Sequence, residues 1–555
     1  MDNVRLFLFM ALAFLGMLIY QAWQQDYGPR PVDQSAAALA EQAAAVDTPL
    51  APTESATPTI DAATPDVPGA MTEPSTTAAA AGLVKIHTDT LDLVIDSRGA
   101  TIIDARLVEY PVSIDQPDVK YRLLSQRPGD YFIAQSGMLG ADRERTPTHE
   151  AVFTTAVSEY TMADDQDTLS VDFEWTSADG VRVVKRYTFT RGKHSVQLQQ
   201  RVDNNSSTVW TGRDYRQLQR GEVAKSGNAF MYTYTGGAIY TQEDKYQKYD
   251  FDDLADGKLD RDATDGWVAM IQHYFLASVV PPRGESQHFY GKRLPNGRAV
   301  IGTYTPPRSV QPGASETFDG QLFIGPKLQA ELESLAQGLD LTVDYGWLVF
   351  IAKPMYWVLE QIYGFVHNWG WTIILFTILI KLAFFKLSET SYRSMANMRK
   401  LTPRIQALKD RYGDDKQRMQ QAMMEMYKTE KINPLGGCLP MLVQIPFFIA
   451  LYWVLLESVE LRQAPWVLWI QDLSIKDPYF VLPLIMGVSM FIQQKLNPPP
   501  PDPMQAKIMM ALPLVFTVMF AFFPAGLVLY WVVNNILSIA QQWVITKRIE
   551  EGAKA

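Results

Sequence analysis

The stretch WGWTIILFTILIKLAFF, residues 369–385, is apolar throughout except for one charged residue, Lys381. A helix over this stretch, at about 1.5 Å per residue, would carry Lys381 roughly 18 Å into a hydrocarbon core about 30 Å thick. A charge near the centre of a membrane helix costs about 2.5 to 3.5 kcal/mol, which favours a polar cavity or a partner for Lys381. Snorkelling toward Lys386 is the alternative, because the long lysine stem can reach the interface. The residues surrounding this helix decide between the two.

Five further segments are apolar enough and long enough to span a membrane. The first, residues 6–20, suits either a cleavable signal peptide or a signal anchor, and the lack of a clear cleavage site after it favours an anchor over residues 1–27. Four more fall within residues 432–547, at positions 435–456, 479–496, 508–523 and 526–545. Together with the Lys381 helix, placed at residues 366–388, they predict a polytopic α-helical membrane protein with six transmembrane helices.

Two segments without spans separate the first membrane helix from the second. Residues 28–82 are rich in Ala, Pro, Thr and Ser and predict a disordered linker. Residues 83–340 show alternation of apolar and polar residues broken by turns, for example over residues 91–110 and 181–202. This pattern predicts a large all-β sandwich domain. The domain contains no cysteine, so an oxidising compartment would give it no disulfides.

The distribution of charge orients the chain. Residues 389–431 carry ten Lys and Arg against six Asp and Glu, so the positive-inside rule places them in the cytoplasm. Six spans then return both termini to the cytoplasm, with residues 548–555 as a tail, and leave the β domain outside. On that outer side, residues 341–365 mix Trp, Tyr and Lys with aliphatic residues, which predicts an amphipathic helix lying in the interface.

The cytoplasmic segment has the apolar spacing of two helices. Positions three and four apart repeat before and after the GDD turn at residues 413–415, at Met398, Leu401, Ile405, Leu408, Tyr412, Met419, Met423 and Met426. The spacing predicts an antiparallel helical hairpin with a coiled-coil-like seam. A solvated connector is the plain alternative. Against it, methionine-rich surfaces suit varied apolar partners, and basic faces suit ribosomal RNA or anionic lipid.

Several spans contribute polar side chains to the membrane core. These are Thr377, one turn before Lys381 on the same face, Gln444 between two prolines of the third span, and Asn534, Asn535 and Ser538 of the sixth. Such residues either give a cavity hydrophilic walls or bond across helices as structural glue. No acidic residue lies within another span to pair with Lys381, so the sequence favours water or an incoming anion as its partner.

Enzyme chemistry finds no support in the sequence. The chain contains neither a Walker-type nucleotide loop nor a cluster with metal-ligand spacing, and the lone Cys438 suits packing better than nucleophilic attack. We therefore expect a non-enzymatic protein without cofactors. A transporter for small anions, with Lys381 as the binding charge, is a second hypothesis, although the internal repeats common in transporters are absent.

Five stretches resemble the YidC/Oxa/Alb family of membrane-protein insertases, in its Gram-negative bacterial form. They are SMANMRKLTPRIQALKDRYGDDKQRMQQAMMEMYKTEKINPLGGCLPMLVQIPFF (residues 394–448), SVELRQAPWVLWIQDLS (458–474), DPMQAKIM (502–509), FPAGLVLYW (523–531) and GWVAMIQHYFLASVVPP (266–282). The resemblance implies a five-helix insertase core in the bacterial inner membrane and a periplasmic β-supersandwich similar to sugar mutarotases. That similarity raises a third hypothesis, a carbohydrate-binding periplasmic receptor using His273.

The resemblance also implies how such a protein works. A membrane-protein insertase and folding chaperone would take the polar part of a nascent chain into a hydrophilic groove, alone or beside the Sec translocon, and release the apolar part into the lipid bilayer. Its hairpin would meet the ribosome and the signal-recognition machinery. The matching positions are a substrate groove of Lys381, Thr377, Gln444, Asn534, Tyr530 and Trp531, and a substrate slide of Ile445, Pro446, Phe447 and Phe448.

Two of these positions depart from the family pattern. The family commonly has arginine where Lys381 stands, and a lysine keeps the charge but loses the bidentate fork. We therefore expect diffuse attraction of anions by Lys381 rather than tight recognition of one carboxylate. Many members have two tyrosines in the sixth span, where this chain has Tyr530 and Trp531.

Overall fold

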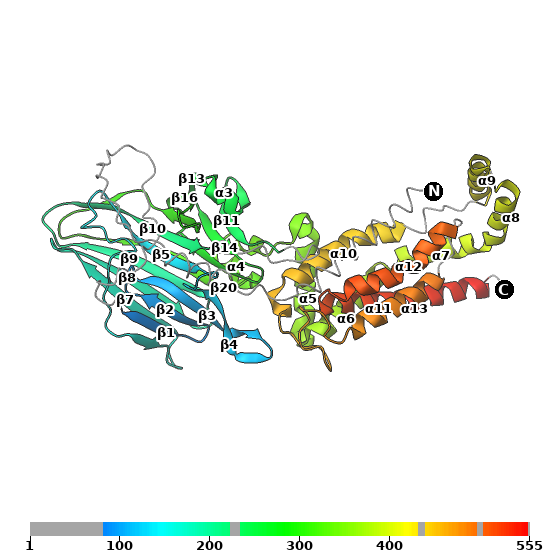
Figure 1. Cartoon of the computed structure of the whole chain (residues 1–555), viewed down its shortest axis with the longest axis horizontal. Helices are drawn as coiled ribbons and strands as arrows, with labels where there is room; N and C mark the ends of the chain where they lie inside the picture. The colour runs from blue at the N-terminus through cyan, green and yellow to red at the C-terminus, as the bar shows by residue number, and fades with distance from the viewer. Residues whose placement is uncertain (1–81, 222–232, 414, 431–438, 497–502, 553–555) are drawn as a thin grey trace, which may run out of the picture.

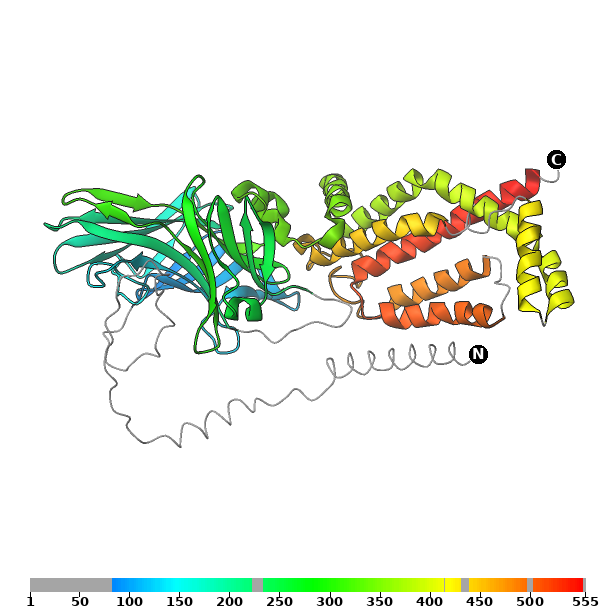
Figure 2. The same cartoon turned by 90° about the horizontal axis from the view of Figure 1, so that it is seen from above.

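The computed structural model describes residues 82–221, 233–413, 415–430, 439–496 and 503–552. The expected anchor and nearly all of the expected linker, as well as Cys438, lie outside these residues. A β domain occupies one end of the molecule and a bundle of helices the other (Figure 1). The same division is seen after a 90° turn, with α8 and α9 farthest from the β domain (Figure 2).

The β domain consists of two sheets. The 11-stranded sheet contains β1 (Leu83–His87), β2 (Leu91–Asp96), β3 (Thr101–Ser113), β4 (Gln116–Leu124), β5 (Phe132–Leu139), β6 (Glu159–Thr161), β10 (Trp210–Arg220), β13 (Asp260–Thr264), β16 (Ser286–Arg293), β17 (Ala299–Tyr304) and β18 (Arg308–Val310). The 9-stranded sheet contains β7 (Thr168–Thr176), β8 (Val181–Thr190), β9 (Ser195–Asn204), β11 (Gly236–Thr241), β12 (Lys245–Tyr249), β14 (Gly266–Ile271), β15 (Phe275–Val280), β19 (Ser315–Phe318) and β20 (Gln321–Pro326). Short helices α3 (Phe251–Ala255) and α4 (Gln329–Leu335) accompany them.

Alternating side chains make the core between the sheets. Along β2 every second residue is buried, which is the period expected of a strand with one face on a core. Ile95 and Ile102 of one sheet and Val183 and Leu198 of the other are fully buried in the same cluster. The sequence alternation therefore predicts the layer correctly, and the all-β sandwich is confirmed. The order of strands, such as β10 between β17 and β5, is a long-range arrangement that the alternation leaves open.

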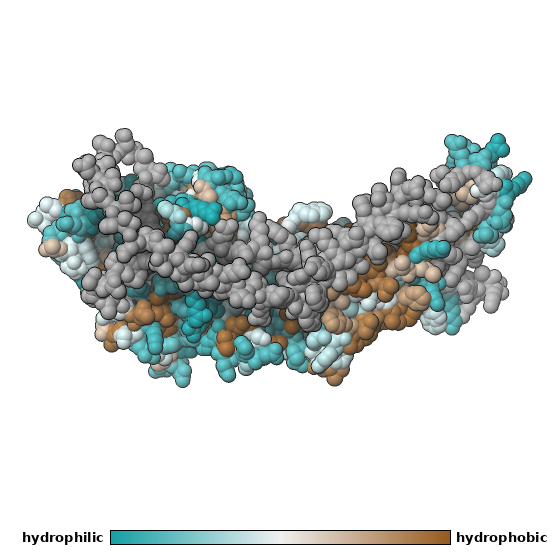
Figure 3. Space-filling view, in the orientation of Figure 1, coloured by the Kyte–Doolittle hydropathy of each residue, from teal (hydrophilic) through white to brown (hydrophobic). Residues whose placement is uncertain are grey.

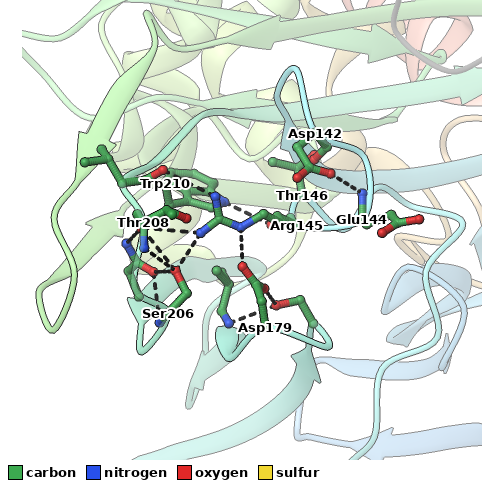
Figure 4. Close-up of polar contacts among 12 residues, drawn as sticks. Asp142, Glu144, Arg145, Thr146, Asp179, Ser206, Thr208 and Trp210 are labelled. Atoms are coloured by element: carbon green, nitrogen blue, oxygen red, sulfur yellow. Dashed lines mark hydrogen bonds and ion pairs between the residues drawn. The ribbon is translucent and has the colours of Figure 1, made fainter.

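Arg145 fastens three loops at one end of this domain (Figure 4). Its guanidinium donates to Ser206 Oγ at 2.6 Å, and its Nε forms an ion pair with Asp179 Oδ2 at 2.7 Å. The indole N–H of Trp210 in turn donates to the Arg145 carbonyl at 2.9 Å. Each bond joins segments more than 30 residues apart, so the cluster stabilises loops that strand pairing alone does not connect.

The chain after Pro326 is helical. Its elements are η1 (Leu339–Thr342), η2 (Gly346–Leu348), α5 (Val349–Val366), α6 (Trp369–Ala383), α7 (Phe385–Lys400), α8 (Thr402–Tyr412), α9 (Lys416–Thr429), α10 (Leu439–Glu457), η4 (Val459–Leu461), α11 (Val481–Leu496), α12 (Pro503–Phe520) and α13 (Ala525–Gly552). The expected first helix of the hairpin is divided at Leu401, because Pro403 lies in the first turn of α8, where its missing N–H is tolerated. Met398 therefore belongs to α7.

The β domain and the helices share a second apolar cluster. It runs from Trp267 and Phe323 in the β domain through Leu348 and Leu359 to helices α6, α10 and α13. Polar contacts reinforce it at the end of α10, where the buried Glu457 carboxylate lies 3.6 Å from the Lys327 ammonium.

A second set of polar contacts joins the β3–β4 hairpin to the loop after α10. Arg462 donates to the carbonyls of Pro111 and Val112 at 2.7 and 3.1 Å, and Gln463 donates to the Pro111 carbonyl at 2.9 Å. These contacts and the apolar cluster place the β domain against one end of the bundle.

Among the described residues, one helix is long and apolar enough by itself to cross a membrane, at Ala525–Arg548 in α13. The pair formed by α6 and the start of α7 passes the same test as one span, although it is bent by 63°. Shorter apolar helices lie at Val443–Glu457, Val481–Leu496 and Ala506–Phe520. A count of six spans therefore remains a prediction.

Candidate functional site

Lys381 is buried in the last turn of α6, just before the bend into α7. Its side chain is 9% exposed, and its ammonium donates a hydrogen bond to Ser538 Oγ of α13 at 2.7 Å. The Ser538 hydroxyl in turn donates a hydrogen bond to the Asn534 backbone carbonyl at 2.6 Å. No carboxylate in the described part of the chain forms an ion pair with Lys381. The site is thus a buried cation held by a neutral hydroxyl, which is the partner that the sequence analysis did not name.

The other predicted groove residues lie around this pair in different ways. Thr377 is buried one turn before Lys381, but its hydroxyl donates to the Ile373 carbonyl of its own helix at 2.6 Å. Gln444 is half-buried on α10, and Asn534 is half-buried on α13. The structure therefore brings Lys381 together with Ser538, and Asn534 contributes its backbone carbonyl to this chain of bonds, while Thr377 lies on the same face of α6 as Lys381.

Tyr530 and Trp531 belong to an aromatic cluster. Their rings lie 6.1 and 4.6 Å from the ring of Phe448 on α10, and Trp531 also contacts Phe520 of α12 at 5.7 Å. Of the other predicted slide residues, Phe447 packs on Phe384 at 5.0 Å. Three helices thus meet along an apolar aromatic wall, which includes part of the predicted slide as well as two predicted groove residues.

The remaining slide residues differ in exposure. Ile445 is 44% exposed on α10, and Pro446 lies inside that helix. A proline within a helix removes one backbone hydrogen bond and leaves a carbonyl for another partner. The slide therefore presents an apolar outer surface next to locally weakened backbone pairing.

Asn535 and Gln542 fasten α13 to its other neighbour, α11. Asn535 donates to Ser489 Oγ at 3.1 Å, and Gln542 donates to the Leu496 carbonyl at 3.2 Å. This is the structural-glue role that the sequence analysis left open for Asn535. Asn535 and Gln542 follow Asn534 and Gln541 by one position each, about 100° further around the helix, and this offset is the signal that separates the two faces.

On the face seen in Figure 3, apolar side chains lie along the visible part of the helical bundle, and polar side chains lie at its end farthest from the β domain. Exposed apolar side chains of the bundle include Leu484 and Val488 of α11, Leu514 of α12, and Ile536 and Trp543 of α13, all 50 to 70% exposed. An exposed apolar surface of this kind suits contact with lipid rather than water. The site at Lys381 is therefore a buried polar centre within a lipid-compatible bundle.

Comparisons with known families cover nearly the whole described chain. The family described as YidC periplasmic domain matches residues 83–358, and the family described as 60Kd inner membrane protein matches residues 361–552. A protein of Methylococcus capsulatus named membrane protein insertase YidC is 53% identical over 100% of this chain and 99% of its own length. The chain belongs to the YidC family of membrane protein insertases. The YidC resemblance seen in the sequence is thereby confirmed.

Other relatives bear the same name. The YidC proteins of Thioalkalivibrio sulfidiphilus and Stutzerimonas stutzeri are 51% and 48% identical, each over 100% of both chains. A crystal structure of an active YidC insertase with its first transmembrane domain resolved covers 83% of this chain and 94% of that one at 18% identity, with a TM-score of 0.37. A galactose mutarotase-like protein from Lactobacillus casei covers 44% of this chain and 100% of its own at 11% identity, with a TM-score of 0.30.

YidC membership settles the broad class. The family consists of inner-membrane insertases and not of enzymes, as expected from the sequence. His273, the basis of the receptor hypothesis, donates from Nε2 to the Leu456 carbonyl at 3.0 Å and stacks on Tyr274 at 3.8 Å. Burial and the nearby Lys327 lower its pKa to about 3, so the ring is neutral. His273 therefore helps to join the β domain to the end of α10.

Proposed function

We propose that this chain inserts nascent proteins into the inner membrane and helps them fold, with Lys381 as the attracting charge. The observation that carries the proposal is the buried Lys381 ammonium, whose bond to Ser538 leaves its charge without a counter-ion in the described part of the chain. A cation in a low-dielectric site attracts anions over longer distances than one in water. Acidic or polar residues at the leading end of a substrate are the ligands that satisfy it.

Lysine suits this task because it attracts a substrate carboxylate without binding it tightly. Its ammonium is a point charge with rotatable donors, whereas an arginine would grip a carboxylate in two parallel bonds. The Ser538 hydroxyl is neutral, so an incoming carboxylate competes with one hydrogen bond to a charged group, worth about 1.5 to 3 kcal/mol. A carboxylate that takes the place of Ser538 forms a hydrogen bond to the same ammonium, so the exchange costs little free energy in either direction.

Release follows the aromatic wall. Once the polar end has passed Lys381, the apolar segment of the substrate contacts the surface formed by Ile445, Phe447 and Phe448 on α10. Burial of apolar residues in lipid supplies the driving force, at about 25 cal/mol per Å². The membrane potential adds about 2.3 kcal/mol per negative charge moved outward per 100 mV.

The proposed topology has six spans, both termini in the cytoplasm and the β domain in the periplasm. It is supported by the placement of the β domain and of α8 and α9 at opposite ends of an apolar bundle (Figures 1 and 2). The exposed side chains of α5, Phe350, Trp357 and Phe365 among them, suit a helix lying in the outer interface. Trp347, in the preceding η2, is exposed as well.

The proposed partners at the cytoplasmic end are the ribosome and the signal-recognition machinery. Helices α8 and α9 are closed on each other by an ion pair between Arg404 and Glu430, and Met424 is 54% exposed on α9. An exposed thioether beside basic side chains suits both apolar targeting sequences and RNA. Cooperation with the Sec translocon is proposed on the family resemblance alone.

Reconstitution separates insertion from transport. The purified full chain in liposomes should convert an added single-span protein with an acidic leading segment to a protease-protected form, without flux of chloride or phosphate. Liposomes carrying the Lys381→Ala variant serve as the matched control. Anion flux without protection of the added protein would refute the insertase proposal and favour the transporter hypothesis.

A further inference from the structure

Gln541 on α13 is a buried amide without a partner. Neither its side-chain oxygen nor its nitrogen is accessible to solvent, and neither forms a hydrogen bond with any described residue. Burying an amide in this state costs about 1 to 3 kcal/mol by the measure of protein mutations. A bound ligand that forms hydrogen bonds with the Gln541 amide would remove this unfavourable free energy.

Its position continues the face of α13 that meets Lys381. Gln541 follows Ser538 by three residues and Asn534 by seven, the spacings of neighbours on one helix face. Trp531 Nε1 is likewise buried without a hydrogen-bond partner among the residues described. At about 1.5 Å per residue, the two unpartnered groups lie roughly 15 Å apart along the helix, with the Lys381–Ser538 bond between them. We call Trp531, Asn534, Ser538 and Gln541 the polar ladder.

The next residue, Gln542, differs from Gln541 in having a hydrogen-bond partner on another helix. Gln542 is turned toward α11, where it donates to the Leu496 carbonyl. Asn535, seven residues earlier, points the same way. The amides that join helices are thus on the α11 side, and the ladder is the side whose amide is unpaired. A hydrogen bond between described helices therefore does not account for Gln541.

The chemistry of the ladder fits an extended peptide. A glutamine amide offers both a donor and an acceptor, which is what one peptide group requires. An indole N–H offers a donor for a backbone carbonyl. An extended chain advances about 3.3 Å per residue, so roughly 15 Å corresponds to four or five residues. The ladder therefore matches a short polar segment lying along α13.

We propose that Gln541 binds the backbone of the incoming polar segment one turn before it reaches Lys381. This proposal rests on the proposed insertase function and adds a substrate-binding residue to it. Gln541 lies on the side of Lys381 toward Lys547 and Arg548, the end of α13 assigned to the cytoplasm. A chain entering from there meets the amide first and the charge second.

Cysteine cross-linking tests the contact directly. In full-length protein lacking Cys438, Gln541→Cys should form a disulfide, on mild oxidation, with a single-span substrate carrying one cysteine in its polar leading segment. Gln542→Cys is the matched control, because its side chain faces α11. Cross-linking at 541 well above that at 542 is the expected result. Equal or absent cross-linking at 541, in protein where Thr377→Cys does cross-link, overturns the proposal.

Insertion assays distinguish binding from packing. Gln541→Leu should lower insertion of a substrate with a polar leading segment roughly threefold to tenfold, the worth of one or two hydrogen bonds, and leave a substrate without that segment unchanged. Gln542→Leu should affect both substrates alike. Equal effects of Gln541→Leu on both substrates would assign it to packing. If Lys381→Ala and Gln541→Leu both behave like the unchanged protein, the attraction mechanism itself fails; if only Gln541→Leu does, this inference alone fails.

Discussion

The Lys381 ammonium of α6 lies 2.7 Å from the Ser538 hydroxyl of α13, and these residues are 157 positions apart in the chain. The pair joins the two helices that enclose the polar centre of the bundle. Lys381 carries a positive charge, whereas Ser538 is neutral and offers only a hydrogen bond. This difference is the basis of the attraction proposed for acidic substrates.

Removing the charge should weaken insertion of substrates with acidic leading segments. We expect Lys381→Ala to reduce their insertion by about tenfold or more, as lost hydrogen bonds to charged groups are worth about 1.5 to 3 kcal/mol, while Lys381→Arg preserves it. Protease protection in liposomes measures the effect. Ser538→Ala is the control, since it removes the resting partner and keeps the charge; a Ser538→Ala defect as large as that of Lys381→Ala would contradict the mechanism.

Breaking the ion pair at the domain junction should loosen the β domain from the bundle. Lys327 and Glu457 are 2% and 3% exposed, so Glu457→Gln leaves a buried ammonium without its counter-charge. Loss of one partner of a buried pair costs about 3 to 5 kcal/mol, whereas replacing both by apolar residues is often neutral. Thermal unfolding should therefore show a lower Tm for Glu457→Gln and recovery in the Lys327→Met, Glu457→Leu double variant. A double variant as unstable as the single one would argue against this account.

The β domain should lose stability in weak acid through His149. Its Nδ1 forms a hydrogen bond with the Tyr215 hydroxyl at 2.6 Å, and burial, with Lys185 and Lys292 nearby, lowers its pKa to about 4. Because the unfolded ring titrates near about 6.5, the unfolded state binds the extra proton between these values, and protonation favours unfolding. The contribution is complete above pH of about 6.5 and falls by about 3 kcal/mol as pH approaches 4. Chemical denaturation across this range measures it, and His149→Gln should flatten the slope; an unchanged slope would refute the assignment.

A methyl group at Gly370 should destabilise the bundle. An added Cβ there would lie 2.1 Å from the ring of Trp466, which packs on the start of α6. Overpacking of this kind costs about 1 to 3 kcal/mol, so Gly370→Ala should lower the Tm in detergent. Gly364→Ala is the matched control, because an added Cβ meets nothing within 4 Å and alanine is the better helix former. It should raise the Tm slightly, and equal shifts for both variants would be inconsistent with a steric cause.

Much of the fold follows from local patterns. Alternation over residues 83–340 predicts the β sandwich, and the apolar runs around Lys381 and after residue 432 predict the helical bundle. The division at Leu401 was missed, although Pro403 is its visible signal. The bend between α6 and α7 has no such signal, since the stretch contains neither proline nor a glycine near Phe384.

The sequence by itself determined that Lys381 would be an exceptional residue, because the cost of a charge in an apolar run depends only on its neighbours along the chain. The sequence also identified the polar residues of the sixth predicted span as candidates for the polar centre of the membrane core. Only the tertiary structure decided that Ser538 is the partner of Lys381, that Asn535 serves α11 instead, and that Gln541 is left unpaired. The physical reason is that a helix presents every side chain at a fixed angle, but its rotation against its neighbours is set by packing over the whole bundle.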